Sequence, residues 1–416
     1  MLARLEALHP FRTPAAQRLA ILFATVYFAQ GMWYLPNQTI TISFKDHGLS
    51  AGQVANFFAM AIVPWLIKPV YGLLSDFVPL FGYHRKSYLM LTSGIAALAG
   101  LVLAGTVDHS YWRLALLVTT MAVGLAFTDV LVDALMVENG KPMGLTGAFQ
   151  SVQWGAIITA SILVGVLGGY FAEHRRLHAA FFVAACFPLL TLLMTAFVVR
   201  EAPARADRES FWTTWIAIRK AMGERDIWVV AGFIFFFTFS PSFGPAFLYY
   251  QTDMLLFDQQ FIGHLAALSA VAGVAGAFIY APLSRSMPLR RLINLSIGAA
   301  VLATLAYLVY RDWRSALVID VVFGCIGMVT RLAFLDLAAK ACPRHVEATF
   351  FAFLMSVYNA GTQVAENVGA RLYDDLGYTP LVLISTAMTA AAWFLVPLVK
   401  IERIEARAKR AELPPA

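Results

Sequence analysis

The stretch that decides the fold is residues 64–88, PWLIKPVYGLLSDFVPLFGYHRKSY. It begins in an apolar run that contains one cation, Lys68, and it ends with Arg85 and Lys86 just before the next apolar run. A lysine inside a membrane span costs about 2.5–3.5 kcal/mol, so Lys68 is expected to face protein or water and to have a partner. Gly72, Asp76 and Arg85 together predict a tight turn between two membrane helices that is held by opposite charges.

The composition of the whole chain indicates a polytopic membrane protein. Of its 416 residues, 60% are hydrophobic and only 13% are charged, whereas soluble domains have about 25% charged residues. One span needs about 20 apolar residues, so this length accommodates about twelve spans with short loops. The net charge of +6 comes from Lys and Arg in alternate loops, which indicates membrane topology and not a nucleic-acid-binding surface.

Hydropathy and helix-breaking residues divide the chain into two sets of six predicted helices. The first set is expected at residues 18–43, 52–74, 87–106, 112–138, 145–171 and 178–199. The second set is expected at residues 227–252, 259–284, 290–310, 314–339, 346–373 and 379–400. The predicted domains are an N-terminal six-helix bundle (1–200), a connector (201–226), a C-terminal six-helix bundle (227–400) and a tail (401–416).

The distribution of basic residues predicts the topology. Of the 31 Lys and Arg residues, 22 fall on one side of the predicted membrane, six on the opposite side and three within spans. The positive-inside rule then places both termini and the connector in the cytoplasm, with the chain in the cell inner (plasma) membrane. The connector has Trp212 and Trp215 among basic residues, which is typical of an amphipathic helix on the inner leaflet.

The two halves of the chain contain related motifs. Leu74–Asp76 and Arg85–Lys86 in the first half are echoed by Leu283–Arg285 and Arg290–Arg291 in the second. Two related sets of six helices are typical of the major facilitator superfamily, in which the substrate is held between the halves near the membrane midplane. The predicted fold class is therefore an all-α membrane protein with twelve transmembrane helices and the fold of this superfamily.

Acidic residues inside the predicted spans are the candidates for proton coupling. Asp129 and Asp133 lie at i and i+4 on one face of the fourth helix, at about the depth of Lys68. Two interpretations stay open: an ion pair of Lys68 with either aspartate that only joins helices, or carboxylates that titrate and couple protons. Glu366 is an isolated acid in the eleventh helix. It could transfer a proton or accept a hydrogen bond from a ligand ring.

Cationic, amide and aromatic side chains predict the substrate site. Arg331 in the tenth helix is expected to hold an anionic substrate, because a guanidinium offers a planar, bidentate fork to a carboxylate. A structural bridge from Arg331 to Asp336 or to an acid of the first half is the alternative. Amides and rings at matching depths suit a flat heteroaromatic ligand, although amides also join membrane helices. The predicted cavity residues are Gln30, Tyr34, Gln153, Trp154, Asn359 and Gln363.

Common motifs of enzymes are absent from the sequence. The sequence has no phosphate-binding glycine loop followed by Lys-Ser/Thr, and no Ser/His/Asp or His-Glu-x-x-His arrangement. The three cysteines have no metal-ligand spacing, and His174 and His178 are without an acidic partner in the sequence. We therefore expect no metal site, no cofactor and no enzyme activity.

Several motifs of the first half are specific enough to indicate a family. Around the opening stretch they are Lys68-Pro69, Tyr71-Gly72, Leu74-Ser75-Asp76, Pro79-Leu80-Phe81-Gly82-Tyr83, Arg85-Lys86 and Tyr88-Leu89. Further on they are Asp129-Val130, Val132-Asp133-Ala134-Leu135, Val137-Glu138 and Gln150-Ser151 with Trp154. In these residues the chain resembles the folate–biopterin transporter family of the major facilitator superfamily. The second half matches only in outline, and its equivalent turn, Ser284–Pro288, lacks the Gly-Tyr element.

This resemblance implies transport of pteridines such as folate and biopterin, with Lys68, Asp129 and Asp133 as functional residues. It also implies an inner gate formed by Asp76, Arg85 and Lys86. We expect a proton-coupled secondary transporter that moves a pteridine-type substrate, or a similar small heteroaromatic anion, by alternating access as a monomer in the lipid bilayer. Two alternatives remain: a superfamily carrier of another small organic solute, and a non-transporting assembly factor for membrane pigment–protein complexes.

Overall fold

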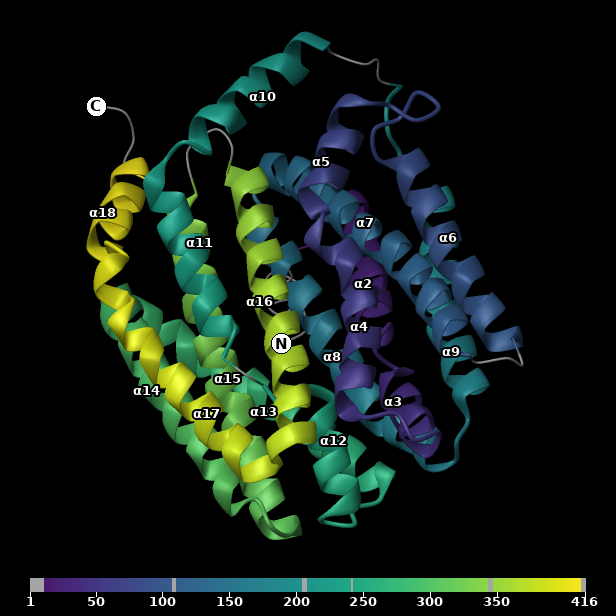
Figure 1. Cartoon of the computed structure of the whole chain (residues 1–416). Helices are drawn as coiled ribbons and strands as arrows, with labels where there is room; N and C mark the ends of the chain where they lie inside the picture. Colours follow the sequence, from purple (N-terminus) through teal and green to yellow (C-terminus); the bar gives the residue numbers. More distant parts are fainter. Residues whose placement is uncertain (1–10, 107–109, 204–207, 241, 343–346, 413–416) are drawn as a thin grey trace, which may run out of the picture. The chain divides into compact units, whose positions relative to one another are not determined.

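The computed structural model describes residues 11–106, 110–203, 208–240, 242–342 and 347–412, and this part of the chain is almost entirely α-helical (Figure 1). Its first helices are α2 (Pro14–Met32), α3 (Asn37–Asp46), α4 (Ala51–Leu66), α5 (Lys68–Phe77), α6 (Lys86–Gly105), α7 (Tyr111–Met143), α8 (Thr146–Glu173) and α9 (Leu177–Val198). There follow α10 (Arg208–Ala221), α11 (Arg225–Thr238), α12 (Gly244–Asp253), α13 (Gln259–Ser286), α14 (Leu289–Ala306), α15 (Trp313–Ala341), α16 (Glu347–Leu376), α17 (Tyr378–Ala391) and α18 (Ile401–Glu412). Short 3-10 segments are η1 (Tyr307–Val309), η2 (Ala392–Phe394) and η3 (Val396–Leu398).

Ten stretches of the described residues are long and apolar enough to cross a membrane, and they coincide with ten of the twelve predicted helices. The predicted seventh helix is divided into α11 with 14 residues and α12 with 10, and each is shorter than the about 20 residues of a span. The predicted eleventh helix is α16, which has 30 residues and several polar side chains along its length. The connector contains α10, on which Trp212 and Trp215 are exposed.

Prolines explain two breaks inside the predicted first and second helices. Between α2 and α3 the chain forms a turn that ends at Pro36, which has no N–H to continue the hydrogen bonds of α2. Between α4 and α5 the helix is interrupted at Ile67, because Pro69 cannot donate to the carbonyl four residues earlier. Lys68 therefore lies at the first position of a new helix and not in the middle of a continuous one.

The predicted seventh helix breaks between Thr238 and Gly244. Gly244 has a φ of +41°, which is a left-handed conformation that a glycine adopts at little steric cost. The N–H of Ser242 donates to the carbonyl oxygen of Ala365 on α16 at 3.2 Å. The break leaves the Ser242 N–H without a partner in its own helix, and the carbonyl oxygen on α16 supplies one. Backbone groups in a membrane interior need such partners, because no water is available there.

Contacts between Cα atoms group the chain into two compact units. Unit 1 consists of Met1–Ile40 and Val70–Arg208, and unit 2 consists of Thr41–Pro69 and Glu209–Ala416. The segment Thr41–Pro69, which contains α4, packs against α12 and α16 of unit 2. The two units therefore differ from the predicted bundles in where this segment packs.

In unit 1, α6 lies along α7 and α9, and α2 packs against α8 and α9 (Figure 1). The helices approach closely at Gly124, where an added Cβ would lie 2.4 Å from the carbonyl oxygen of Thr92. Three aromatic rings pack together in the core of this unit. Phe149 stacks on Phe11 with a centroid distance of 5.3 Å, and it contacts Phe23 edge to face with a centroid distance of 5.0 Å. Tight helix packing of this kind fixes the positions of the polar residues on α2, α7 and α8.

In unit 2, α13 and α14 pack against α15, and α4 packs along α16. The rings of Phe233 and Phe237 stack on Phe334 with centroid distances of 5.4 and 4.1 Å. At Gly324 on α15 an added Cβ would lie 2.2 Å from the carbonyl oxygen of Ser269 on α13. Small residues at such crossings are typical of membrane helix pairs, whose stability comes from close packing.

Candidate functional site

Asp133 on α7 is the centre of a hydrogen-bonded group within unit 1. The hydroxyl of Tyr27 on α2 donates to Asp133 Oδ1, and Gln153 Nε2 on α8 lies 3.5 Å from the same oxygen. Tyr27 is fully buried, whereas Asp133 itself is exposed. The structure therefore joins the predicted residues Asp133 and Gln153 and gives a carboxylate on a membrane-spanning helix that water or a ligand can reach.

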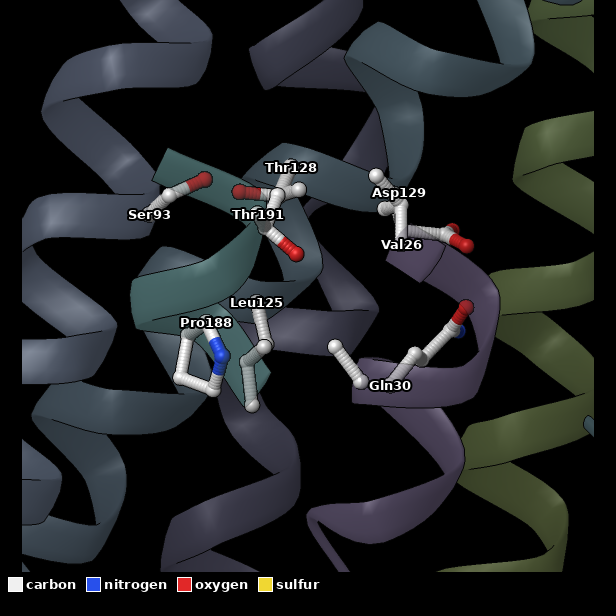
Figure 2. Close-up of a pocket in the computed structure, with 9 residues that line it drawn as sticks. Val26, Gln30, Ser93, Leu125, Thr128, Asp129, Pro188 and Thr191 are labelled. Carbon is white, nitrogen blue, oxygen red and sulfur yellow. The ribbon is translucent and has the colours of Figure 1, made fainter. Parts of the chain in front are cut away.

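Asp129 lies one turn before Asp133 and has a different environment. It is only 4% exposed, and together with Gln30 it lines a narrow pocket inside unit 1 (Figure 2). In Figure 2 the Asp129 carboxylate and the Gln30 amide extend to the same side of the pocket. Tyr34 lies in the turn after α2 and is half exposed, and Trp154 follows Gln153 on α8. The i, i+4 pair of acids thus consists of one buried and one accessible carboxylate.

On α16 the predicted residues Asn359, Gln363 and Glu366 occupy one helical face, because they are four and three residues apart. The Nε2 atom of Gln363 is buried without a hydrogen-bond partner among the described residues. Glu366 lies against the first residue of α12, since a Cβ added to Gly244 would be 3.0 Å from Glu366 Cβ. This places an acid of one helix beside the break in another helix of unit 2.

The two predicted cations lie in unit 2. Arg331 is exposed on α15. Asp336 on the same helix accepts a hydrogen bond from Lys340 Nζ at 2.8 Å. Lys68 begins α5, and its ammonium lies 4.9 Å from the centroid of the Trp65 ring, a distance typical of a cation–π contact. The pairing of Lys68 with an aspartate of α7 concerns residues of different units, and it stays a prediction.

Arg85 lies at the centre of a charged cluster before α6. It is 7% exposed and donates to Asp76 Oδ1 at 2.5 Å, to Glu138 Oε1 at 2.7 Å and to Ser75 Oγ at 2.7 Å. Burial alone would lower the pKa of Arg85, but the hydrogen bonds and charges of Glu138 and Asp76 outweigh it and raise the pKa. The structure thus brings two predicted gate residues together and adds Glu138 from the end of α7.

Glu201, which follows α9, caps the start of α6. Its carboxylate accepts hydrogen bonds from the backbone N–H groups of His84 at 2.9 Å, Arg85 at 3.0 Å and Lys86 at 2.8 Å. A carboxylate there satisfies N–H groups that a helix start leaves unpaired and also interacts favourably with the helix dipole. The Lys86 ammonium donates to the carbonyl oxygen of Ala196 at 3.2 Å. The predicted gate turn is therefore fixed to the end of the sixth span.

Asp374 on α16 caps a second helix, α4, within unit 2. Its Oδ2 accepts from Gly52 N at 2.8 Å and its Oδ1 from Ala51 N at 3.2 Å. Further contacts join the segment Thr41–Pro69 to the same helices of unit 2. They are Lys45 Nζ–Asp253 Oδ1 at 2.5 Å, Tyr249 OH–Leu49 O at 2.6 Å, Asn367 Nδ2–Ala55 O at 3.1 Å and Arg371 Nη2–Asn56 Oδ1 at 3.2 Å. We name these contacts, with that of Asp374, the α4 latch.

Substitution of Asp374 by alanine is expected to destabilise the α4 latch by about 1–2 kcal/mol, the usual effect of losing a charged cap at a helix start. The measurement is the apparent melting temperature of the detergent-solubilised protein. Asp375→Ala is the matched control, because Asp375 is the next residue on α16 and makes no hydrogen bond or ion pair with the described residues. Equal melting temperatures for the two variants would show that the cap contributes nothing.

Sequence comparison identifies the family of this chain. The sequence profile of the BT1 family, the folate–biopterin transporters, matches residues 30–382. The chain belongs to the BT1 family. The family consists of transporters and not of enzymes, and the matched residues include α7, α15 and nearly all of the predicted site.

Two relatives of this BT1 chain have names that describe transport. It is 32% identical over 385 residues to a folate-biopterin transporter of Synechocystis, and this alignment covers 88% of this chain and 76% of the relative. It is 25% identical over 357 residues to folate transporter 2 of Plasmodium falciparum, and this alignment covers 82% of this chain and 77% of the relative. The similarity thus extends over most of both chains.

Solved structures show the fold of the BT1 chain. A POT family transporter in complex with 5-aminolevulinic acid superimposes with a TM-score of 0.72 over 92% of this chain and 96% of that chain, at 12% identity. At this identity the likeness concerns the fold alone. The prediction of an all-α, multi-pass membrane protein with the major facilitator superfamily fold is confirmed.

Some residues of the site were not predicted from the sequence. Glu138 and Glu201 complete the cluster at Arg85, and Ser93 and Thr191 line the pocket of Asp129. An acid just beyond a predicted span is a weak signal for a helix cap, because any distant helix start could be its partner. Single hydroxyl residues in apolar helices give no signal, since most of them bond their own backbone.

Proposed function

We propose that this protein is a secondary transporter that moves a pteridine-type substrate across the membrane by alternating access, driven by protons. Membership of the BT1 family is the observation that supports it most, together with 32% identity to a protein named as a folate-biopterin transporter. A pteridine with a glutamate side chain offers carboxylates and a flat ring with several donors and acceptors. The predicted site has the matching chemistry of cations, amides and aromatic rings.

Asp133 is the proposed proton-coupling residue on α7. Its carboxylate is accessible and accepts from Tyr27 and Gln153, so a change of its protonation would change hydrogen bonds to two other helices of unit 1. Glu366 is the second proposed proton carrier, because it is an isolated acid at the break between α11 and α12. Acids inside membrane spans are costly and are usually functional.

The proposed substrate contacts are divided by chemistry. Arg331 and Lys68 would hold the anionic part of the substrate, because Arg331 is exposed and Lys68 lies at a helix start beside Trp65. Amides and rings would bind the heteroaromatic part. This second group comprises Gln30, Tyr34, Gln153, Trp154, Asn359 and Gln363.

We further propose that the cluster of Asp76, Arg85 and Lys86 belongs to the gate on the cytoplasmic side. The protein would lie in the inner membrane of the cell, with both of its termini in the cytoplasm. The excess of basic residues on one side of the predicted membrane supports this orientation. In the same orientation the α4 latch belongs to the opposite, outer side. Rearrangement of these two polar clusters would accompany alternating access.

Ligand binding gives a first test. Folate and biopterin are expected to raise the apparent melting temperature of the purified protein, because a ligand at about 100 times its Kd stabilises the native state by about 2.7 kcal/mol. Aminobenzoylglutamate, which has the carboxylates of folate but no pteridine ring, is the control and is expected to give a much smaller shift. Shifts with nucleosides or peptides and none with the two pteridines would contradict the proposed substrate class.

A further inference from the structure

The start of α14, the segment after α17 and the start of α18 lie next to one another in unit 2 (Figure 1). A wide pocket opens to the surface between them, with a volume of about 950 Å³ that includes the part open to solvent. Its lining includes Arg290, Arg291, Asn294, Leu295, Trp393 and Glu402, and we name it the α14 pocket. Arg290 Nη1 on α14 lies 2.6 Å from Glu402 Oε1 on α18, so the two helix starts are at the same end of unit 2.

The charged groups of the α14 pocket have a surplus of positive charge. Arg291 is exposed and makes no hydrogen bond or ion pair with the described residues. Arg290 pairs with Glu402, but their side chains are 46% and 61% exposed, and exposed pairs of this kind contribute little to stability. Two guanidinium groups against one carboxylate therefore favour an anionic ligand. A phosphate group suits them, because a guanidinium can donate two parallel hydrogen bonds to its oxygens.

The indole ring of Trp393 packs across α14 beside these charges. Its N–H donates to the carbonyl oxygen of Asn294 at 3.3 Å. The ring also covers Gly298, where an added Cβ would lie 3.3 Å from Trp393 Cζ2. Tryptophan is common at the boundary between lipid headgroups and acyl chains, because its ring is apolar and its N–H is polar. The position of Trp393 is thus typical of a residue at the membrane interface.

Along α14 the surface changes from charged to apolar. Arg291, Leu295 and Leu302 follow one face of the helix, because they are four and seven residues apart, and both leucines are exposed. Phe394, in the neighbouring η2, is exposed as well. Leu302 is about 16 Å from Arg291 along the helix axis, which is about half of the roughly 30 Å hydrocarbon core of a bilayer. A charged end, a tryptophan and an apolar face in this order match the headgroup, the boundary and the acyl chains of one lipid leaflet.

We propose that the α14 pocket binds an anionic phospholipid, with the phosphate at Arg291 and Arg290 and the acyl chains along Leu295 and Leu302. Basic pockets at the ends of membrane helices are typical binding sites for anionic headgroups. The apolar face favours a lipid over a soluble phosphate, which would contact the arginines alone. Glu402 limits the affinity, because its carboxylate pairs with Arg290 and repels a second anion. The binding is independent of the transported substrate and of the side of the membrane that this end of unit 2 faces.

The test measures the melting temperature of the full-length, delipidated protein in detergent at increasing concentrations of dioleoyl-phosphatidylglycerol. We expect a saturable stabilising shift, because a ligand that binds only the folded protein stabilises it. Dioleoyl-phosphatidylcholine, whose headgroup has no net charge, and glycerol phosphate, which has no acyl chains, are expected to give none at the same concentrations. Absence of a shift with phosphatidylglycerol, or an equal shift with phosphatidylcholine, would overturn the anionic site. An equal shift with glycerol phosphate would overturn the lipid as its ligand.

Two variants are expected to change the half-saturating concentration of phosphatidylglycerol in opposite directions. Arg291→Ala is expected to raise it about fivefold, the usual effect of one basic residue near anionic lipid. Glu402→Gln is expected to lower it, because the substitution releases Arg290 and removes a repelling charge, and a higher value would contradict the proposal.

Arg285→Ala is the matched control for the two variants. Arg285 is exposed near the end of α13, makes no hydrogen bond or ion pair with the described residues and does not line the α14 pocket. This variant removes the same charge as Arg291→Ala and is expected to keep the wild-type half-saturating concentration. Equal effects of Arg285→Ala and Arg291→Ala would overturn the site, because they would show an attraction of lipid to the basic surface in general.

Discussion

Substitution of Asp133 by asparagine is expected to abolish proton-driven accumulation of a pteridine while the protein still folds and binds its ligand. Asparagine keeps an oxygen that accepts a hydrogen bond from the buried Tyr27 hydroxyl, so the hydrogen bond between α2 and α7 is retained. It removes the only titratable group of that side chain. We expect the initial rate under an inward proton gradient to fall by at least about tenfold, which corresponds to about 1.4 kcal/mol.

Asp133→Glu is the control for this prediction, because it keeps a titratable carboxylate at the same position with a longer side chain. It is expected to keep measurable pH-dependent uptake and to have a higher KM. If Asp133→Asn accumulates the ligand at the wild-type rate and with the wild-type pH dependence, then the proton role of Asp133 is wrong.

Substitution of Arg85 by alanine is expected to cause the largest loss of stability in unit 1. It removes hydrogen bonds to Asp76, Glu138 and Ser75 at once. The side chains of Asp76 and Glu138 are 45% and 49% exposed, so water will partly replace the guanidinium. We therefore expect a loss of about 2–3 kcal/mol, less than the 3–5 kcal/mol for breaking a fully buried pair.

The measurement for Arg85 is the apparent melting temperature in detergent together with the rate of uptake. Arg85→Lys is the matched control, because a lysine keeps the charge but its single ammonium cannot reproduce the geometry of the guanidinium. It is expected to recover part of the stability. A melting temperature of Arg85→Ala equal to that of the wild type would show that the cluster does not hold the turn before α6.

The helices of this protein follow from hydropathy, but their interruptions do not. The apolar runs predicted ten spans with boundaries within five residues of those found. The break at Ile67 was not predicted, because prolines occur in membrane helices with and without breaks. The division of the seventh helix into α11 and α12 agrees with the interruption that Pro241, Gly244 and Pro245 indicate in the sequence. The packing of Thr41–Pro69 with unit 2 depends on tertiary contacts that no local pattern encodes.

The site was predictable where its partners are close in sequence. Asp76 and Arg85 flank one short turn, and their motif predicted an interaction between opposite charges. In the structure Arg85 Nη2 lies 2.5 Å from Asp76 Oδ1. Tyr27 and Asp133 are 106 residues apart, and Gly52 and Asp374 are 322 residues apart. Contacts at such separations depend on the helix arrangement, so periodicity identifies the polar side chains but not their partners.

Uptake of labelled folate into vesicles that contain the purified protein tests the central claim most directly. We expect saturable uptake above that of protein-free vesicles, faster with an inward proton gradient and reduced by excess unlabelled biopterin. Uptake equal to that of protein-free vesicles for both folate and biopterin, in a preparation whose melting temperature shows that it is folded, would contradict the proposed function.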